Sequence, residues 1–257
     1  MADFALLIEY DGAPFVGWQK QGAGVSVQGV VEEAARRLNH DAPVACFVAG
    51  RTDAGVHAAG QVAGITLADG WAPERLREAL NYHLRPHPVA ILRAAPAPEG
   101  WHARFSAIGR AYRYLISNRA ARPALAAGRV WHVPRPLDDA AMAAAAKTLL
   151  GRHDFTSFRA SACQAKTPIR TLDRLDVVRE GDRIAIIAEA RSFLHHQVRN
   201  MVGTLKLVGE GRWHIDDVAR ALAARDRAAA GPTAPPAGLC LTGVRYPVPL
   251  DPFTEAA

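Results

Sequence analysis

Hydrophobic and polar positions recur with two clear periods in the first part of the chain, and these periods predict its elements. Residues 4–10 alternate with period two, which predicts a strand that Asp11-Gly12 ends. Apolar residues at helical spacing follow Ser26, a favoured N-cap residue, and predict a helix. Strands at 44–49, 61–67 and 89–92 and a helix beginning at Pro73 complete a β-α-β-β-α-β order, the split βαβ arrangement.

The second part repeats this order loosely. It is predicted to contain a strand at 110–117, a helix after Asp138 and Asp139, a hairpin of 169–178 and 183–190, helices at 198–208 and 215–222, and a last strand at 239–246. Two such units place equivalent sheet edges against each other, so we expect a groove between them. Residues 228–238 are rich in Ala, Pro and Gly, which predicts a loop or mobile lid.

Composition narrows the class of protein. The chain has 257 residues, of which 49% are hydrophobic and 22% charged, so disorder is excluded as its main state. It has neither a long apolar run nor the pattern of a signal peptide, and we therefore expect a cytoplasmic protein without a membrane segment. Three cysteines lie far apart and form no CxxC, which indicates reduced thiols rather than a zinc site or a disulfide framework.

The charge balance gives the first functional hint. Lys and Arg number 31 against 25 Asp and Glu, a net charge of +6, and arginine supplies most of the excess. Such arginines can be solvated products of codon bias, or they can bind a polyanion, since guanidinium groups suit phosphates. One cluster favours the second interpretation and predicts a stripe facing phosphates: Arg104, Arg110, Arg113, Arg119 and Arg122.

The segment GRTDAGVHA, residues 50–58, holds an arginine and a carboxylate between two glycines directly after a predicted strand. This loop can present Asp53 with little freedom. Taken alone, it is more typical of an Asx turn in which Asp53 bonds its own backbone, and Asp11 is interpreted in the same way. The chain has no GxxxxGK[ST] or GxGxxG loop, so no nucleotide cofactor is indicated.

Two further stretches carry candidate chemistry. Tyr112 and Tyr114 are predicted on one strand face with Arg110, where aromatic rings could stack on an unpaired base or simply belong to the core. His195 and His196 are predicted to begin a helix, with Arg199 one turn later. Adjacent histidines project about 100° apart on a helix, which makes a metal site a poor interpretation and favours capping or RNA-facing roles.

These stretches carry a family resemblance. GRTDAGVHA is accompanied by GWQ and VQG upstream and by HARFSAIGRAYRY, FLHHQVRNMVG and GLCLTGVRYP downstream. In this order and spacing the chain resembles the tRNA pseudouridine synthase A family, the tRNA pseudouridine(38-40) synthases. The match extends from Phe4 to Tyr246 and omits only 228–236 and the tail.

The resemblance implies a role for each of five residues. Asp53 corresponds to the catalytic aspartate, Tyr112 to the tyrosine on the target uracil, and Arg199 to the arginine paired with the aspartate. Arg51 matches an arginine that holds the extruded nucleotide. A leucine of residues 239–241 should line the same pocket, and Leu241 is our choice.

The resemblance also implies the architecture and the partners. The expected fold is α/β (α+β): two ferredoxin-like-related halves forming a continuous, mainly antiparallel sheet, with helices packed on it and an RNA cleft between the halves. We assign 1–105 to the half with the Asp53 loop and 106–257 to the half with Tyr112 and Arg199. The expected enzyme is a cytoplasmic homodimer that uses neither metal nor organic cofactor and acts on uridines 38, 39 and 40 in the anticodon stem-loop of transfer RNA.

Three functions are therefore compared. The favoured one is an isomerase that makes pseudouridine. The alternative is a non-catalytic RNA-binding protein with the same basic cleft and a structural Asp53. A weaker third is a metal-dependent hydrolase that uses His195, His196 and Asp154.

Overall fold

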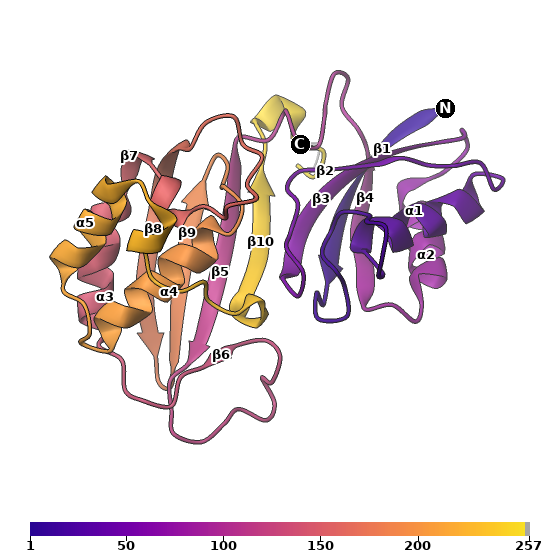
Figure 1. Ribbon diagram of the computed structural model, residues 1–257. Coiled ribbons are helices and arrows are strands. Elements are labelled where there is room, and N and C mark those ends of the chain that lie inside the picture. Colours follow the sequence, from indigo (N-terminus) through magenta and orange to yellow (C-terminus); the bar gives the residue numbers. More distant parts are fainter. Residues whose placement is uncertain (255–257) are drawn as a thin grey trace. The chain divides into compact units, whose positions relative to one another are not determined.

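The computed structural model describes residues 1–254, which form two compact units (Figure 1). Within the described residues, the first unit consists of residues 1–110 and 241–254, and the second consists of residues 111–240. The predicted division at residue 105 stays a prediction. Within the described residues, no helix has the length and apolar character that crossing a membrane requires.

The first unit has the predicted β-α-β-β-α-β order. Its strands lie in the order β4-β1-β3-β10. Strand β1 is antiparallel to its two neighbours, β3 and β4, and the short β2 pairs antiparallel with β3. The elements are β1 Ala2–Tyr10, α1 Val27–Leu38, β2 Cys46–Val48, β3 His57–Leu67, α2 Pro73–Leu84, β4 Val89–Pro96 and β10 Leu239–Arg245.

Both helices of this unit begin as the sequence predicts. Ser26 Oγ accepts a hydrogen bond from Gly29 N at 3.1 Å, which caps α1. Pro73 is the first residue of α2, where its missing N–H costs nothing. Leu76 and Leu80 are buried along one face of α2, and Figure 1 shows α1 and α2 together on one face of the sheet.

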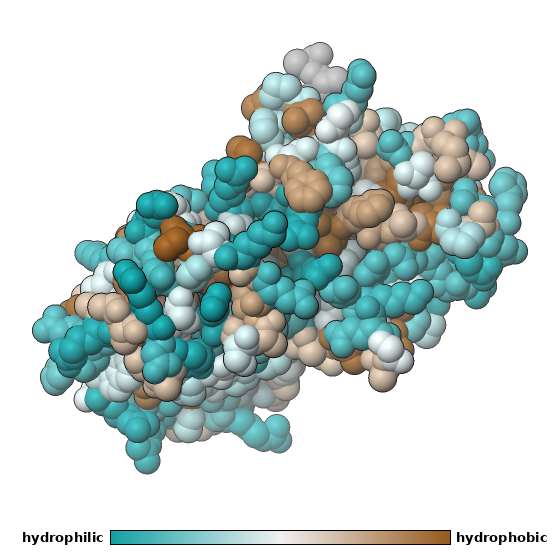
Figure 2. All heavy atoms as spheres, turned by 45° about the horizontal axis from the view of Figure 1, so that its top comes forward, coloured by the Kyte–Doolittle hydropathy of each residue, from teal (hydrophilic) through white to brown (hydrophobic). Residues whose placement is uncertain are grey.

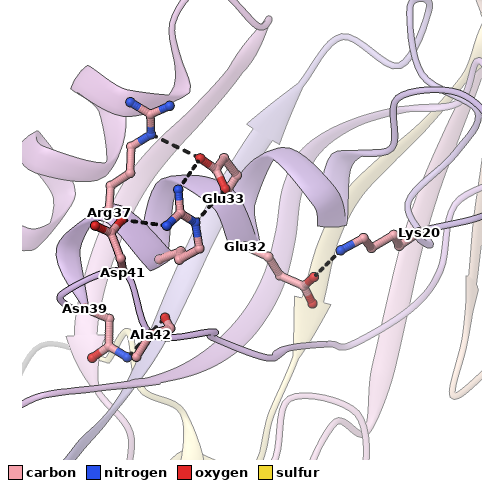
Figure 3. A network of polar contacts seen from close by, with 8 residues as sticks. Lys20, Glu32, Glu33, Arg37, Asn39, Asp41 and Ala42 are labelled. Carbon is pink, nitrogen blue, oxygen red and sulfur yellow. Dashed lines mark hydrogen bonds and ion pairs between the residues drawn. The ribbon is translucent and has the colours of Figure 1, made fainter.

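Helix α1 carries charged residues with two different functions (Figure 3). Glu33 accepts hydrogen bonds from Arg36 Nε at 2.9 Å and Arg37 Nε at 3.2 Å, and these bonds, led by that of Arg36, lower its pKa to about 2. Because the group is exposed, this pair adds little stability. Glu32 instead accepts from Cys46 N at 3.2 Å and so connects α1 to β2.

The second unit is built on strands in the order β5-β9-β8-β7, with β6 parallel to β5. Its elements are β5 Gly109–Ser117, which begins two residues before the unit, β6 Trp131–His132, α3 Asp139–Ala146, β7 Gly151–Asp154, β8 Ile169–Glu180, β9 Arg183–Ala190, α4 Gln197–Gly209 and α5 Ile215–Ala224. Short 3₁₀ helices of this unit occur at Lys147–Leu149, Thr156–Phe158, Arg227–Ala229 and Pro236–Gly238, and one of the first unit occurs at Val248–Leu250. The predicted fold class, a mixed α/β chain with a large, mostly antiparallel sheet and helices packed on it, is confirmed.

The differences from the predicted elements are local. The β8–β9 hairpin is confirmed, with Glu180 opposite Arg183. The strands β6 and β7 were not predicted, because two to four residues are too few to show a period. Strand β3 begins earlier than predicted, at His57, so the end of GRTDAGVHA lies within a strand.

Residues 228–238 form a loop, as predicted, and this loop is bound to α4. Thr233 Oγ1 donates to Asn200 Oδ1 at 2.7 Å, and Gly231 N donates to Thr204 Oγ1 at 3.0 Å. The loop approaches the helix so closely that a Cβ on Gly203 would lie 1.7 Å from Pro232 O. Further along, Tyr114 Oη on β5 donates to Pro235 O at 2.8 Å.

Removing that last contact should weaken the second unit. Tyr114 is fully buried, and burial raises the pKa of its hydroxyl, which stays a donor. We expect Tyr114→Phe to lower the free energy of unfolding by about 0.5–1.5 kcal/mol, the net worth of one hydrogen bond. Tyr82→Phe is the matched control, because Tyr82 is 71% exposed. Urea denaturation of both variants provides the measurement, and equal midpoints would contradict the prediction.

Candidate functional site

Asp53 lies in a turn between β2 and β3 whose shape comes from its backbone. Val56 N donates to Asp53 O at 3.1 Å and closes the turn. Gly55 has a φ of 76°, a left-handed conformation that favours glycine. The Asp53 side chain is half-buried. The backbone of residues 53–56 therefore closes this turn.

Buried polar groups hold this loop in place by hydrogen bonds. Thr52 is buried, its carbonyl accepts from Trp18 N at 3.0 Å, and its hydroxyl lies 2.8 Å from Tyr10 Oη. Gln61, fully buried in β3, donates from Nε2 to Gly50 O at 2.7 Å. These contacts join the loop to β1, to β3 and to the loop before α1, so the position of Asp53 depends on all three segments.

A second loop, which follows β1, packs against the Asp53 turn. His57 Nδ1 lies 3.1 Å from Gly12 N, which donates to it, and 3.1 Å from Asp11 Oδ1. Asp11 Oδ1 also accepts from Ala13 N at 3.0 Å, so the predicted Asx turn at Asp11 is confirmed. A Cβ on Gly12 would lie 2.0 Å from Val56 O, the carbonyl at the end of the Asp53 turn.

The other predicted residues of the first unit differ in exposure. Arg51 precedes Asp53 by two positions and is exposed. Leu241 is fully buried on β10, and Leu239 is 5% exposed. The choice of Leu241 as a pocket residue stays a prediction.

In the second unit, β5 has the predicted alternation. Tyr112 and Tyr114 are buried, and Arg113 between them is exposed. The Tyr112 ring packs edge-on against Phe193, with centroids 5.3 Å apart and planes at 88°. Tyr114 is fully buried, and its ring packs edge-on against Trp131, whereas Tyr112 retains 9% exposure.

Arg199 lies in the first turn of α4 and is held by the loop that covers this helix. Its Nε donates to Ala234 O at 2.8 Å, and Ala234 N donates to Arg199 O at 3.1 Å. The two bonds run in opposite directions between the same two residues. Residues 228–238 therefore fix the direction of the guanidinium, a role that the sequence did not reveal.

The helix predicted at 198–208 is confirmed, but the prediction that His195 and His196 begin it is wrong. Helix α4 begins at Gln197, and His196 has a φ of 62° and a ψ of 4°, outside the helical region. The rings of His195 and His196 lie 4.0 Å apart, tilted by 45°. The helical argument that these rings point about 100° apart therefore does not apply.

Asp154, the third residue of the hydrolase alternative, serves a turn. Its Oδ1 accepts from Thr156 N at 2.9 Å and from Thr156 Oγ1 at 2.6 Å. Its Oδ2 lies 3.7 Å from Arg225 Nε. These contacts explain the carboxylate without a metal.

The predicted arginine stripe is wrong for Arg110. This side chain is 8% exposed and donates to the carbonyls of Ala49 at 2.7 Å, Arg104 at 2.9 Å and Ala107 at 3.2 Å. Arg113 points to the opposite strand face, because successive side chains of a strand alternate. Spacing along the sequence could not distinguish a guanidinium that binds phosphate from one that binds carbonyls.

The comparisons with known proteins show the family of this chain. The family model described as tRNA pseudouridine synthase matches residues 6–106 and 145–247. The chain belongs to the tRNA pseudouridine synthase family. Asp53, Arg51, Arg199 and Leu241 lie within the matched segments, and Tyr112 lies between them.

Individual relatives match over nearly their whole length. A protein of Acidiphilium cryptum named tRNA pseudouridine synthase A is 68% identical over 255 residues, covering 98% of this chain and 99% of that protein. Proteins of the same name from Paramagnetospirillum magneticum and Rhodospirillum centenum are each 60% identical over 246 residues. These two alignments cover 96% of this chain and 96% and 100% of the relatives. The predicted family is confirmed.

The close approach of Gly12 to the Asp53 turn can be tested through stability. A Cβ at position 12 must displace Val56, so we expect Gly12→Ala to lower the free energy of unfolding by about 1–3 kcal/mol. Gly50→Ala, in the Asp53 loop that Gly12 packs against, is the control, since a Cβ there meets nothing within 4 Å. Calorimetry should show a lower Tm for Gly12→Ala alone, and a similar Tm for both variants would contradict the packing argument.

Proposed function

We propose that this chain converts uridine to pseudouridine in transfer RNA, at positions 38, 39 and 40 of the anticodon stem-loop, with Asp53 as the catalytic carboxylate. The observation that carries the proposal is a half-buried carboxylate on a loop held by buried polar groups, in a member of the tRNA pseudouridine synthase family. The tRNA pseudouridine synthase A relatives support the same substrate class.

The reaction is an isomerisation and needs no net oxidant or reductant. The bond between N1 and C1′ breaks, the base turns, and a bond forms between C5 and C1′. The proton on C5 leaves, and N1 gains a proton. An ionised carboxylate can attack the base or assist at the sugar, and Asp53 is the group proposed for this step.

The remaining residues support that carboxylate and the base. Arg199, oriented by Ala234, is proposed to pair with Asp53 and favour its charged form. Tyr112 is proposed to stack on the uracil, with Phe193 fixing its ring. Arg51 is proposed to hold the extruded nucleotide, and Leu241 to line the pocket.

The target uridine must leave its stack before it can react. Unstacking costs a few kcal/mol, which aromatic stacking and phosphate contacts can offset. A net charge of +6 favours association with the polyanion. A cytoplasmic location is part of the proposal.

Replacing Asp53 by asparagine separates catalysis from structure. The turn is closed by the Asp53 carbonyl, so Asp53→Asn should keep the loop and the Tm. An amide cannot serve as nucleophile or base, so single-turnover pseudouridine formation should fall by at least about 10³-fold. Tritium release from C5-labelled uridine in transfer RNA measures this step.

The matched control is Asp69→Asn, which removes the same charge from an exposed position of the same unit. Filter binding on the same preparations tests whether transfer RNA still binds. Near-normal turnover by folded Asp53→Asn protein would contradict the assignment and favour a non-catalytic RNA-binding protein.

We also propose that the active form is a homodimer, as the resemblance implies. In a symmetric dimer one anticodon arm can contact both subunits. Sedimentation equilibrium at micromolar concentration should give a mass near twice 27.6 kDa. A mass of one chain, with activity retained at that concentration, would contradict the dimer.

A further inference from the structure

Two large aromatic side chains of the first unit are exposed close to one another. Hydrophobic residues reach the surface in places (Figure 2), and Phe47 and Phe105 are 57% and 74% exposed. The His102 ring lies near both, with its centroid 5.8 Å from that of Phe47 and 4.4 Å from that of Phe105. The guanidinium carbon of Arg104 is 5.8 Å from the Phe105 centroid. We call these four residues the aromatic platform.

The platform is built on a rigid turn. His102 N donates to Ser106 Oγ at 3.0 Å, and Ser106 N donates to His102 O at 3.0 Å. His102 Nδ1 accepts from Arg104 N at 3.0 Å and Phe105 N at 3.3 Å, which fixes the plane of its ring. A preordered surface loses little conformational freedom when it binds a ligand.

The platform is also anchored to the Asp53 loop. Arg110 donates to Arg104 O within the platform turn and to Ala49 O, four residues before Asp53. Phe47 itself lies on β2, the strand that leads into the same loop. A single buried guanidinium therefore positions the platform relative to the proposed catalytic carboxylate within one unit.

The chemistry of the platform fits an unpaired nucleotide. Aromatic faces stack on bases of any sequence, and an arginine beside them adds cation–π attraction and a contact for phosphate. A wholly apolar partner would not use the Arg104 charge. Contiguous exposed aromatic surface is unfavourable in water unless a ligand covers it.

We propose that the aromatic platform binds unpaired bases of the transfer RNA substrate, stacked on Phe105 and on Phe47, with Arg104 against a phosphate. This inference rests on the proposed function, because it takes transfer RNA as the ligand. It adds a second contact, outside the pocket of the reacting uridine, that orients the anticodon arm on the first unit.

Anticodon-arm RNA carrying 2-aminopurine at each unpaired loop position in turn is the probe. Stacking quenches 2-aminopurine fluorescence, so we expect quenching at one or more positions with the unaltered protein and its loss with Phe105→Ala. In filter binding, Phe105→Ala and Phe47→Ala should each weaken RNA affinity by about 10- to 100-fold. Phe105→Tyr, which keeps the ring, should restore affinity.

Tyr82→Ala is the matched control, because Tyr82 is exposed on α2 of the same unit, outside the platform. Unchanged affinity of both phenylalanine variants, at unchanged Tm, would overturn the proposal. So would a Phe105→Ala protein that loses self-association, since the platform would then be a contact between copies of the chain.

The readouts distinguish this proposal from the proposed function. Binding and fluorescence need no turnover. If the unaltered protein binds RNA through the platform yet makes no pseudouridine, the platform stands and the isomerase proposal fails. If turnover is normal and the fluorescence of every loop position is unchanged on binding, the platform fails alone.

Discussion

A loop can hold a half-buried carboxylate in one orientation only if the buried N–H and C=O groups of its backbone have hydrogen-bond partners. In this chain Tyr10, Gln61 and the Trp18 amide meet that requirement by bonding to Thr52 and Gly50. These partners come from β1, β3 and the loop before α1. An unsatisfied buried amide or carbonyl costs about 1–3 kcal/mol, so a loop that moved would lose several such contacts together. The rest of the first unit can be understood as the support for this loop.

The same principle orients the arginines. Arg199 and Arg110 both donate hydrogen bonds from their guanidinium groups to backbone carbonyls of segments distant in sequence. A guanidinium has several donors in a rigid plane, so one or two bonds to the backbone fix its direction. Arginine therefore acts in this chain as a structural hydrogen-bond donor as well as a positive charge. The net charge of the chain overstates the number of arginine side chains that can bind phosphate.

Much of the fold was predictable because its elements are long and strongly periodic. Strand β1 follows from the alternation of apolar and polar residues. Helix α1 follows from apolar residues at helical spacing after the Ser26 N-cap, and α2 from the same spacing after Pro73. Candidate residues followed from one uncommon motif, GRTDAGVHA, and from the resemblance that it supports. The apolar period located α4, but the exclusion of His195 and His196 from it was not predictable. Their sequence resembles that of helix residues, and only the left-handed backbone at His196 places the start after them.

The sequence by itself determined the long periodic strands and helices, the family to which the chain belongs, and the carboxylate that is the candidate catalyst. These features depend on local periodicity and on short motifs, which can be recognised in the sequence without the structure. The tertiary structure decided that Arg110 binds carbonyls, that residues 228–238 hold Arg199, and that Phe47 lies near His102 and Phe105. Such contacts join residues about 35 to 60 positions apart in the sequence. Hydrogen bonds and ring stacking depend on distances of a few ångströms in space, which the spacing of residues along the chain does not determine.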